Sequence, residues 1–238
     1  MEQQVILLTG ASAGIGKTTA QLLMKRGAIV YGASRSANGE MEKDISSGGE
    51  LIHINMDVNN EVDIQKALDR IMQKHQKLDV VICNAGNGLA GSVEDSDSEE
   101  VKYQFETNFF GVVKTIQACL PVFRKQGFGR IINVSSVAAI IPIPYQAFYS
   151  SVKSASLIFM QALAMEVKPF GIQCCTVLPG DTKTGFTAAR RYASKASKAD
   201  SAYFVQMKKA VGKMEQDEQN GMPPEVIAKA MMREVYRP

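Results

Sequence analysis

Short apolar runs alternate with longer segments of helical periodicity along most of the chain. The runs are apolar at nearly every position, as strands are when helices cover both faces of their sheet. Because crossover connections between such strands are right-handed, the alternation favours a doubly wound parallel sheet in a single α/β domain over residues 1–238. The predicted strands are residues 5–9, 29–33, 51–55, 80–84, 130–135 and 173–178, and the predicted helices are 14–26, 61–75, 99–123 and 149–168.

Residues 181–222 interrupt this alternation. They open with small, polar and basic residues and continue into an amphipathic helix that Gly221 ends, before Pro223-Pro224 begins a last helix. We interpret 181–222 as a lid inserted over a substrate site, because functional loops commonly occupy such a place. The alternative is a solvated surface segment whose apolar stripe packs on the domain. The stripe consists of Phe204, Met207, Val211 and Met214.

The composition is that of a globular protein without a strongly charged partner. Of the 238 residues, 45% are hydrophobic, which is enough for a sizeable core. The 27 Lys and Arg residues outnumber the 24 Asp and Glu residues only slightly, so neither nucleic acid nor a membrane is an expected partner. No segment approaches the roughly 20 apolar residues that span a bilayer, and the N-terminus lacks the basic region of a signal peptide. We therefore expect a cytoplasmic protein.

The four cysteines do not indicate a metal site. Cys83, Cys119, Cys174 and Cys175 lack CxxC spacing. Cys174 and Cys175 are neighbours in a predicted strand and would point to opposite faces of it. We expect reduced thiols, with neither a bound metal nor a disulfide framework.

A glycine-rich turn, with the sequence TGASAGIG, joins the first predicted strand to the first predicted helix. Glycines permit a tight turn and let backbone N–H groups approach a pyrophosphate, while the helix N-terminus favours the negative charge. We predict a dinucleotide site here, although such a turn alone also occurs for purely structural reasons. The predicted contacts are Gly10, Ser12, Gly14, Ile15 and Gly16.

The end of this turn, Gly14-Ile15-Gly16-Lys17-Thr18, also resembles the end of a phosphate-binding P-loop. The P-loop pattern requires a glycine where this chain has Ala11. No predicted strand ends in an aspartate suited to hold magnesium. Phosphoryl transfer is therefore disfavoured, and Lys17 is interpreted as a solvated residue.

The end of the second predicted strand indicates which dinucleotide binds. A site for NAD usually places an acidic residue there, where it accepts hydrogen bonds from the ribose hydroxyls. This chain has Ser34 and Arg35 instead, and a guanidinium pairs well with the 2′-phosphate of NADP. NADP is therefore the predicted cofactor. NAD is the alternative, with Arg35 as an exposed loop charge.

Two further segments lie at the carboxyl edge of the predicted sheet, where the crevice of a doubly wound fold opens. Asp57-Val58 follow the third predicted strand, and Asn84-Ala85-Gly86 follow the fourth. Asp57 is predicted to accept a hydrogen bond from the adenine amino group. Its alternative role is to cap the helix that begins near Glu61.

Four other polar residues are suited to proton transfer. Tyr149 and Lys153 lie four residues apart on one predicted helix and therefore share a face. This pair is common by chance, but Ser136 lies at the exit of a strand thirteen residues before the tyrosine, and Asn108 lies in an earlier helix. The four residues together are far more specific than the pair.

The order of these motifs resembles the short-chain dehydrogenase/reductase family. The resemblance spans essentially the whole chain, and residues 84–91 and 104–111 are similar in particular to the branch of 17β-hydroxysteroid and retinol dehydrogenase-like proteins. It implies a Rossmann-type fold and an oxidoreductase that interconverts a ketone or aldehyde and an alcohol with NADP(H). The resembling segments are TGASAGIG, NAG, Asn108, Ser136, YSSVK and Pro179-Gly180.

The resemblance implies a role for each of these residues. Tyr149 would be the general acid in reduction and the general base in oxidation, with its pKa lowered from near 10 by Lys153 and the oxidised nicotinamide. Lys153 would also bind the nicotinamide ribose. Ser136 would donate to the substrate oxygen, and Asn108 would hold a water that links Lys153 to solvent. The nicotinamide end would be covered by Pro179, Gly180, Thr182 and Thr184.

Ordinary structural interpretations compete with these roles. Ser136 would cap the end of a strand, Asn108 would bond to the backbone, and Tyr149 would be an aromatic residue at a helix start. The chain also departs from the family, which usually has a further strand after the last helix, whereas this sequence stops at Pro238. Either that strand is absent or the natural protein is longer.

The sequence defines the substrate less well than the reaction. Residues 89–93, 138–146 and the lid are predicted to line its site, and the apolar run 137–144 favours a bulky apolar ketone. The eight basic residues from Lys183 to Lys213 could attract an acidic substrate, but we favour a solvated face.

Two questions of class and assembly complete the prediction. The alternative to an enzyme is a nucleotide-sensing protein that keeps the cofactor site without turnover. By resemblance, we expect a homodimer or homotetramer formed by the helices that carry Asn108 and Tyr149, although core packing would need the same apolar residues. Those residues include Phe109, Val113, Phe159 and Met160.

Overall fold

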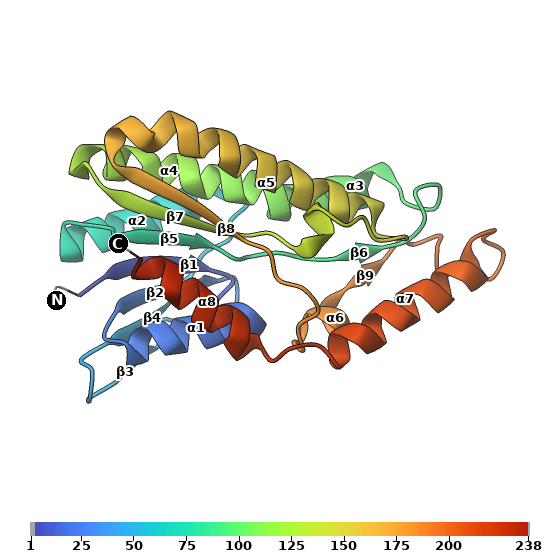
Figure 1. Cartoon of the computed structure of the whole chain (residues 1–238), viewed down its shortest axis with the longest axis horizontal. Coiled ribbons are helices and arrows are strands. Elements are labelled where there is room, and N and C mark those ends of the chain that lie inside the picture. The colour runs from blue at the N-terminus through green and yellow to red at the C-terminus, as the bar shows by residue number, and fades with distance from the viewer. Residues whose placement is uncertain (1–2, 238) are drawn as a thin grey trace.

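A seven-stranded sheet forms the centre of the molecule, for which a computed structural model describes residues 3–237 (Figure 1). The strand order is β3-β4-β2-β1-β5-β7-β8, and the described neighbours are parallel except for β3 and β4. The chain winds outward from β1 in both directions, so the predicted doubly wound Rossmann-type sheet is confirmed. The strands are β1 Val5–Thr9, β2 Ile29–Ser34, β3 Met41–Lys43, β4 Glu50–Asn55, β5 Val80–Cys83, β7 Gly129–Val134 and β8 Ile172–Val177.

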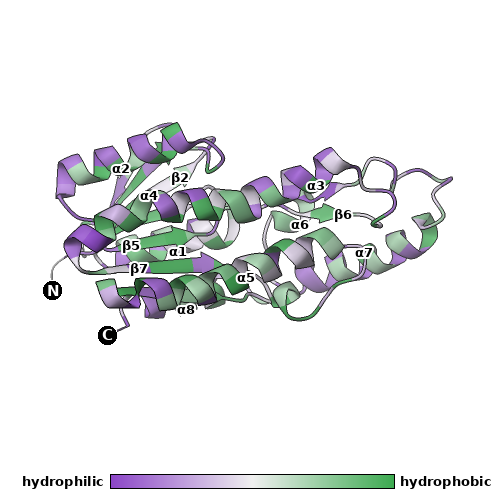
Figure 2. Ribbon diagram, turned by 90° about the horizontal axis from the view of Figure 1, so that it is seen from above, coloured by the Kyte–Doolittle hydropathy of each residue, from purple (hydrophilic) through white to green (hydrophobic). Residues whose placement is uncertain are grey.

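Helices cover both faces of the sheet because its strands are apolar on both sides. On one face α2 (Glu61–His75), α4 (Gly111–Gln126) and α5 (Ala147–Val167) bury one large cluster, and on the other α1 (Gly14–Lys25) and α8 (Pro224–Val235) bury a second. Figure 2 shows β5 as hydrophobic, whereas the exposed helix α2 alternates between hydrophilic and hydrophobic positions. None of the helices in residues 3–237 is long and apolar enough to cross a membrane.

The predicted helix over residues 99–123 is interrupted in the structure. It consists of α3 (Ser98–Phe105), a π-helical turn η1 (Glu106–Phe110) and then α4. Such a single π-helical turn within a helix is frequent at functional sites. Asn108 is the buried residue of this turn.

The lid segment, residues 181–222, contains α6 (Phe186–Ala189), β9 (Arg191–Tyr192) and α7 (Phe204–Gln219), which projects beyond the sheet in Figure 1. β9 pairs in parallel with the short strand β6 (Leu89–Ala90). Of the apolar stripe of α7, Met207 and Val211 are buried in a separate cluster with this strand pair, Met214 packs partly buried against it, and Phe204 is not part of it. The buried members of that cluster are Leu89, Ala90, Ala193, Ala196, Met207 and Val211.

The four cysteines are free thiols, as expected. Cys83 and Cys119 are buried, and Cys174 and Cys175 are partly buried. Burial raises the pKa of Cys83 to about 12 and those of Cys174 and Cys175 to about 11, which leaves them unreactive near neutral pH.

Candidate active site

One cavity of about 550 Å³ opens at the carboxyl ends of the parallel strands. It is lined by every residue that we predicted to contact the cofactor and by Ser136, whereas Asn108 lies behind its wall. The sequence motifs are therefore brought together at one site. These lining residues are Gly10, Ser12, Gly14, Ile15, Gly16, Ser34, Arg35, Asp57, Val58, Asn84, Ala85, Gly86, Tyr149, Lys153, Pro179, Gly180, Thr182 and Thr184.

The turn between β1 and α1 has the geometry of an anion site. Gly10 has a φ of +70°, and a Cβ on Gly16 would lie 2.1 Å from the Gly10 carbonyl oxygen, so both positions require glycine. The N-cap residue of α1, Ala13, gives no side-chain cap, and the first turn contains no acidic residue. The first N–H groups of α1 are therefore left to bind a pyrophosphate.

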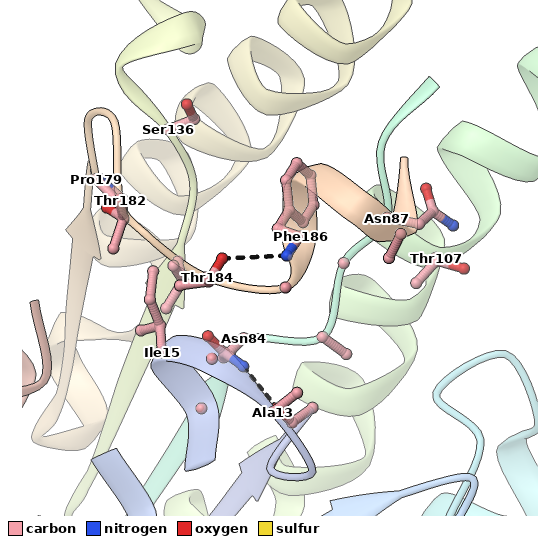
Figure 3. Close-up of a pocket in the computed structure, with 18 of the residues that line it drawn as sticks. Ala13, Ile15, Asn84, Asn87, Thr107, Ser136, Pro179, Thr182, Thr184 and Phe186 are labelled. Atoms are coloured by element: carbon pink, nitrogen blue, oxygen red, sulfur yellow. Dashed lines mark hydrogen bonds between the residues drawn. The ribbon is translucent and has the colours of Figure 1, made fainter. Parts of the chain in front are cut away.

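Asn84 ties this turn to β5. Its side-chain Nδ2 donates to the carbonyl oxygens of Thr9 and Gly10, at 3.0 and 3.1 Å. The Thr9 hydroxyl in turn accepts from the backbone N–H groups of Asn84 and Ala85. Asn84 thus fixes the shape of the glycine turn, in addition to lining the cavity (Figure 3).

The residues predicted to bind the adenosine half, Ser34, Arg35 and Asp57, line the end of the cavity that lies at the ends of β2 and β4. Arg35 is exposed at this end and takes part in none of the ion pairs found among residues 3–237. The Asp57 carboxylate accepts from the Asn59 N–H at 2.9 Å. The alternative role of Asp57 as a helix cap is wrong, because the Asn60 side chain caps α2 by accepting from the Val62 N–H.

Tyr149 and Lys153 share one face of α5, as the spacing predicts. The Lys153 Nζ lies 5.7 Å from the centre of the Tyr149 ring and donates to the Val134 carbonyl at 3.1 Å. No carboxylate among residues 3–237 forms an ion pair with it. Burial therefore lowers the pKa of Lys153 to about 8.

Ser136 acts as a cap, as its competing interpretation stated in part, and its predicted bond to the substrate oxygen stays a prediction. Its hydroxyl accepts from the Ala138 N–H at 3.1 Å and so caps the short helix η2 (Val137–Ala139). The same side chain acts on the Tyr149 phenol and lowers its pKa. The hydrogen bond from the Ala138 N–H holds the Ser136 hydroxyl in place near the Tyr149 phenol.

Asn108 is held by the backbone, as its competing interpretation stated. Its Nδ2 donates to Asn87 Oδ1 at 2.8 Å and to the Gln104 carbonyl at 2.9 Å. A Cβ on Gly86 would lie 2.8 Å from Asn108 Oδ1 and 3.7 Å from the Lys153 Nζ. Asn108 therefore lies near Lys153, on the other side of Gly86, and its water-holding role stays a prediction.

Comparison with known proteins agrees with this arrangement. Residues 4–195 match the family model for short chain dehydrogenases. The chain belongs to this family. A 3-ketodihydrosphingosine reductase of Bacteroides thetaiotaomicron is 40% identical over 237 residues, which cover 100% of this chain and 85% of that protein.

Solved structures show the same fold. A short-chain dehydrogenase from Streptomyces avermitilis superposes with a TM-score of 0.81 at 26% identity, over 98% of this chain and 83% of that one. One from Burkholderia phymatum, in complex with NAD, gives 0.83 at 21% identity, over 98% and 86%. This short-chain dehydrogenase is accordingly an oxidoreductase with a nucleotide-binding Rossmann fold.

The expected lowering of the Tyr149 pKa is not produced by the chain's own groups. Burial is the largest cause and raises this pKa to about 12, against a smaller lowering by the Ser136 hydrogen bond. The phenol is therefore protonated at neutral pH. A protonated phenol has the form that a general acid needs in the reduction of a carbonyl, and the role of Tyr149 stays a prediction.

The substrate end of the cavity differs in part from the prediction. Residues 89–93 do not line it, because β6 packs in the lid cluster. Of the predicted apolar wall, Val137 and Ile143 face the cavity, whereas Ile140 and Ile141 are each 66% exposed.

Most of the remaining lining residues lie in the two segments, 138–146 and the lid, that were predicted to line the substrate site but in which no individual residue was chosen. Phe186 stands in the middle of the site in Figure 3, with its ring 5.9 Å from that of Tyr149. Gln146 is 2% exposed, and its amide Nε2 has no hydrogen-bond partner in the described chain. The lid also supplies Asp181, Thr187, Met214 and Glu218, whereas Asn87 and Thr107 lie outside the predicted segments and were missed.

Proposed function

We propose that this protein is an NADP(H)-dependent reductase that converts a ketone or aldehyde into an alcohol, with Tyr149 as general acid. The observation that carries this proposal is the convergence of Ser136, Tyr149 and Lys153 on the wall of one cavity that begins at an uncapped, glycine-rich turn. The same residues would run the reverse oxidation, with Tyr149 as general base.

The residues of the chain divide the work as follows. The nicotinamide, when bound, supplies the hydride to the carbonyl carbon. Ser136 hydrogen-bonds the carbonyl oxygen and stabilises the negative charge that develops on it. Tyr149 gives its proton to that oxygen, and the Lys153 ammonium stabilises the phenolate that remains. Asn108 positions Asn87 and the backbone beside Lys153.

The preference for NADP over NAD rests on Arg35. Its guanidinium is exposed beside Ser34 at the end of β2, and no acidic residue follows that strand before Glu40. A 2′-phosphate at this place would gain a charge-assisted pair and meet no like charge.

A bulky, largely apolar ketone suits the substrate end. Val137, Ile143, Phe186 and Met214 supply its apolar lining. The 40% identical relative acts, by its name, on 3-ketodihydrosphingosine, which makes that compound the first substrate to test. Localisation in the cytoplasm and assembly into a homodimer or homotetramer stay predictions. Met160, one of the apolar residues named for the predicted subunit interface, is buried in the core of the chain itself.

The proposal is tested by following NADPH oxidation with a panel of ketones and aldehydes, with NADH as the matched cofactor. We expect turnover with NADPH and a weaker reaction with NADH. Arg35→Ser should raise the KM for NADPH by about tenfold to a hundredfold, the range of a lost charge-assisted bond, and change the KM for NADH little.

A nucleotide-sensing protein without turnover is the rival interpretation. It would bind NADPH and oxidise it with none of the carbonyl compounds. A reaction faster with NADH than with NADPH would instead leave the reductase in place and contradict the role of Arg35.

A further inference from the structure

The lid buries one cation between two carboxylates. The Arg190 side chain is 0% exposed; its Nη1 lies 3.4 Å from Glu215 Oε1, and its Nη2 bonds Glu218 Oε1. The guanidinium was predicted to belong to a solvated basic face, which is wrong for this residue. One positive charge shared by two negative charges leaves the network with a net charge of about −1.

Of the two carboxylates, Glu218 faces the active-site cavity. Glu218 lines the cavity, whereas Glu215 does not and accepts a hydrogen bond from the Tyr192 hydroxyl at 2.6 Å. Glu218 Oε2 accepts from the Thr187 hydroxyl at 2.7 Å. Because a carboxylate offers about four acceptor positions, Arg190 and Thr187 leave Glu218 able to accept further hydrogen bonds.

Glu218 is connected to Tyr149 through Arg190 and Phe186. The centre of the Phe186 ring lies 5.9 Å from that of Tyr149 and 5.7 Å from the guanidinium of Arg190, which bonds Glu218. The Glu218 charge also reaches Tyr149: after burial, it adds more to the raised pKa of that phenol than Arg190 takes away. The cavity that Tyr149 lines therefore also has a negatively charged wall.

The cations that line the cavity do not neutralise this wall. Arg35 lies at the predicted adenosine end, and Lys153 donates to the Val134 carbonyl behind Tyr149. Asp57 and Asp181, the other charged lining residues, are also negative. A ligand group beside Glu218 thus meets an unbalanced negative charge in a partly dehydrated site, and a cation is the chemistry that balances it.

We propose that Glu218 is a specificity-determining residue that binds a protonated amine placed close to the carbonyl of an otherwise apolar ketone. This inference rests on the proposed reductase function and names its substrate class. Val137, Ile143 and Met214 contact the hydrocarbon part, and the amine meets Glu218 while the carbonyl oxygen meets Ser136 and Tyr149. Acidic substrates are rejected by the same charge.

The test compares two ketones that differ in charge. 3-Ketodihydrosphingosine carries an amine on the carbon next to its carbonyl, and its N-acetyl derivative has the same chain without the charge. We expect wild-type kcat/KM with NADPH to be about tenfold to a hundredfold higher for the amine, chiefly through KM, as for a charge-assisted hydrogen bond. Glu218→Gln should collapse this ratio toward one.

Glu215→Gln is the matched control, because it removes a carboxylate from the same network but not from the cavity wall. It should keep the preference for the amine, and thermal unfolding of both variants reports whether the lid still packs. Wild-type protein that reduces both ketones equally, or a preference that survives Glu218→Gln, would overturn the inference and leave the reductase standing. Failure to reduce any ketone would overturn the proposed function and this inference with it.

Discussion

The catalytic region and the lid each bury one cation, and they surround it differently. Lys153 on α5 has a carbonyl oxygen as its partner and no carboxylate, so that burial lowers its pKa to about 8. Arg190 in the lid is equally buried but lies between Glu215 and Glu218. Lys153 thus has no negatively charged partner, whereas Arg190 has two.

This difference separates stability from function. An unpaired buried ammonium destabilises the fold, so its presence beside Tyr149 points to a chemical use, namely the support of a phenolate. The guanidinium of Arg190 is stabilised by its partners, and one of the two carboxylates, that of Glu218, lines the cavity. Lys153 and Glu218 both line the same cavity as Tyr149.

Removing the catalytic cation should have the largest effect. Lys153→Met is expected to lower kcat for ketone reduction by about 10²- to 10⁴-fold, because the phenolate loses its counter-charge. It should also raise the free energy of unfolding at pH 7 by up to about 3 kcal/mol, since the pKa falls from 10.5 to about 8 on folding. Steady-state kinetics and urea unfolding measure the two effects.

The sign of the stability effect depends on pH. Between pH 8 and 10.5 the unfolded chain binds a proton that the folded chain has lost, so wild-type stability rises with pH in this window. The advantage of Lys153→Met is therefore full below pH 8 and shrinks toward pH 10.5. A variant that is less stable than wild type at pH 7 would contradict the account of an unpaired ammonium.

Removing the lid cation should act in the opposite sense. Arg190→Met leaves Glu215 and Glu218 close together without their counter-charge, and we expect a loss of about 3–5 kcal/mol of stability at pH 7. Urea unfolding checks this. Glu215→Gln keeps the pair between Arg190 and Glu218 and should lose much less; equal losses in the two variants would show that packing alone decides.

The pH dependence of the reaction is the smallest expected effect. Because kcat/KM reports groups of the free enzyme, its value for reduction should fall about tenfold between pH 7 and pH 9 as Lys153, with a pKa of about 8, loses its proton. Tyr149, with a pKa of about 12, stays protonated throughout this range. A profile that is flat up to pH 10 would contradict the assignment of the falling limb to Lys153.

Much of the fold could be predicted because the buried strands are continuous apolar runs in the sequence. The strand β3 was missed, since its three residues, Met41–Lys43, are all exposed and pair antiparallel at the sheet edge. The pair β6 and β9 has two residues in each strand, too few for any pattern. The π-turn at Asn108 kept the helical periodicity on both sides and so was also invisible.

The candidate site also has a part that could be predicted from the sequence and a part that could not. Its cofactor and catalytic residues lie in contiguous motifs, which local spacing reveals. Phe186 and Thr187 lie in α6 and Glu218 lies in α7, and tertiary packing alone brings these two helices to the cavity that Tyr149 lines. Arg190 was interpreted as part of a solvated face because its carboxylate partners lie 25 and 28 residues away.

The central claim is that Tyr149 donates the proton in an NADPH-dependent reduction. Single-turnover reduction of 3-ketodihydrosphingosine by Tyr149→Phe, with NADPH already bound, tests it most directly. We predict that the variant binds NADPH and reduces the ketone about 10²- to 10⁴-fold more slowly than wild type. Reduction by Tyr149→Phe at the wild-type rate would contradict the account.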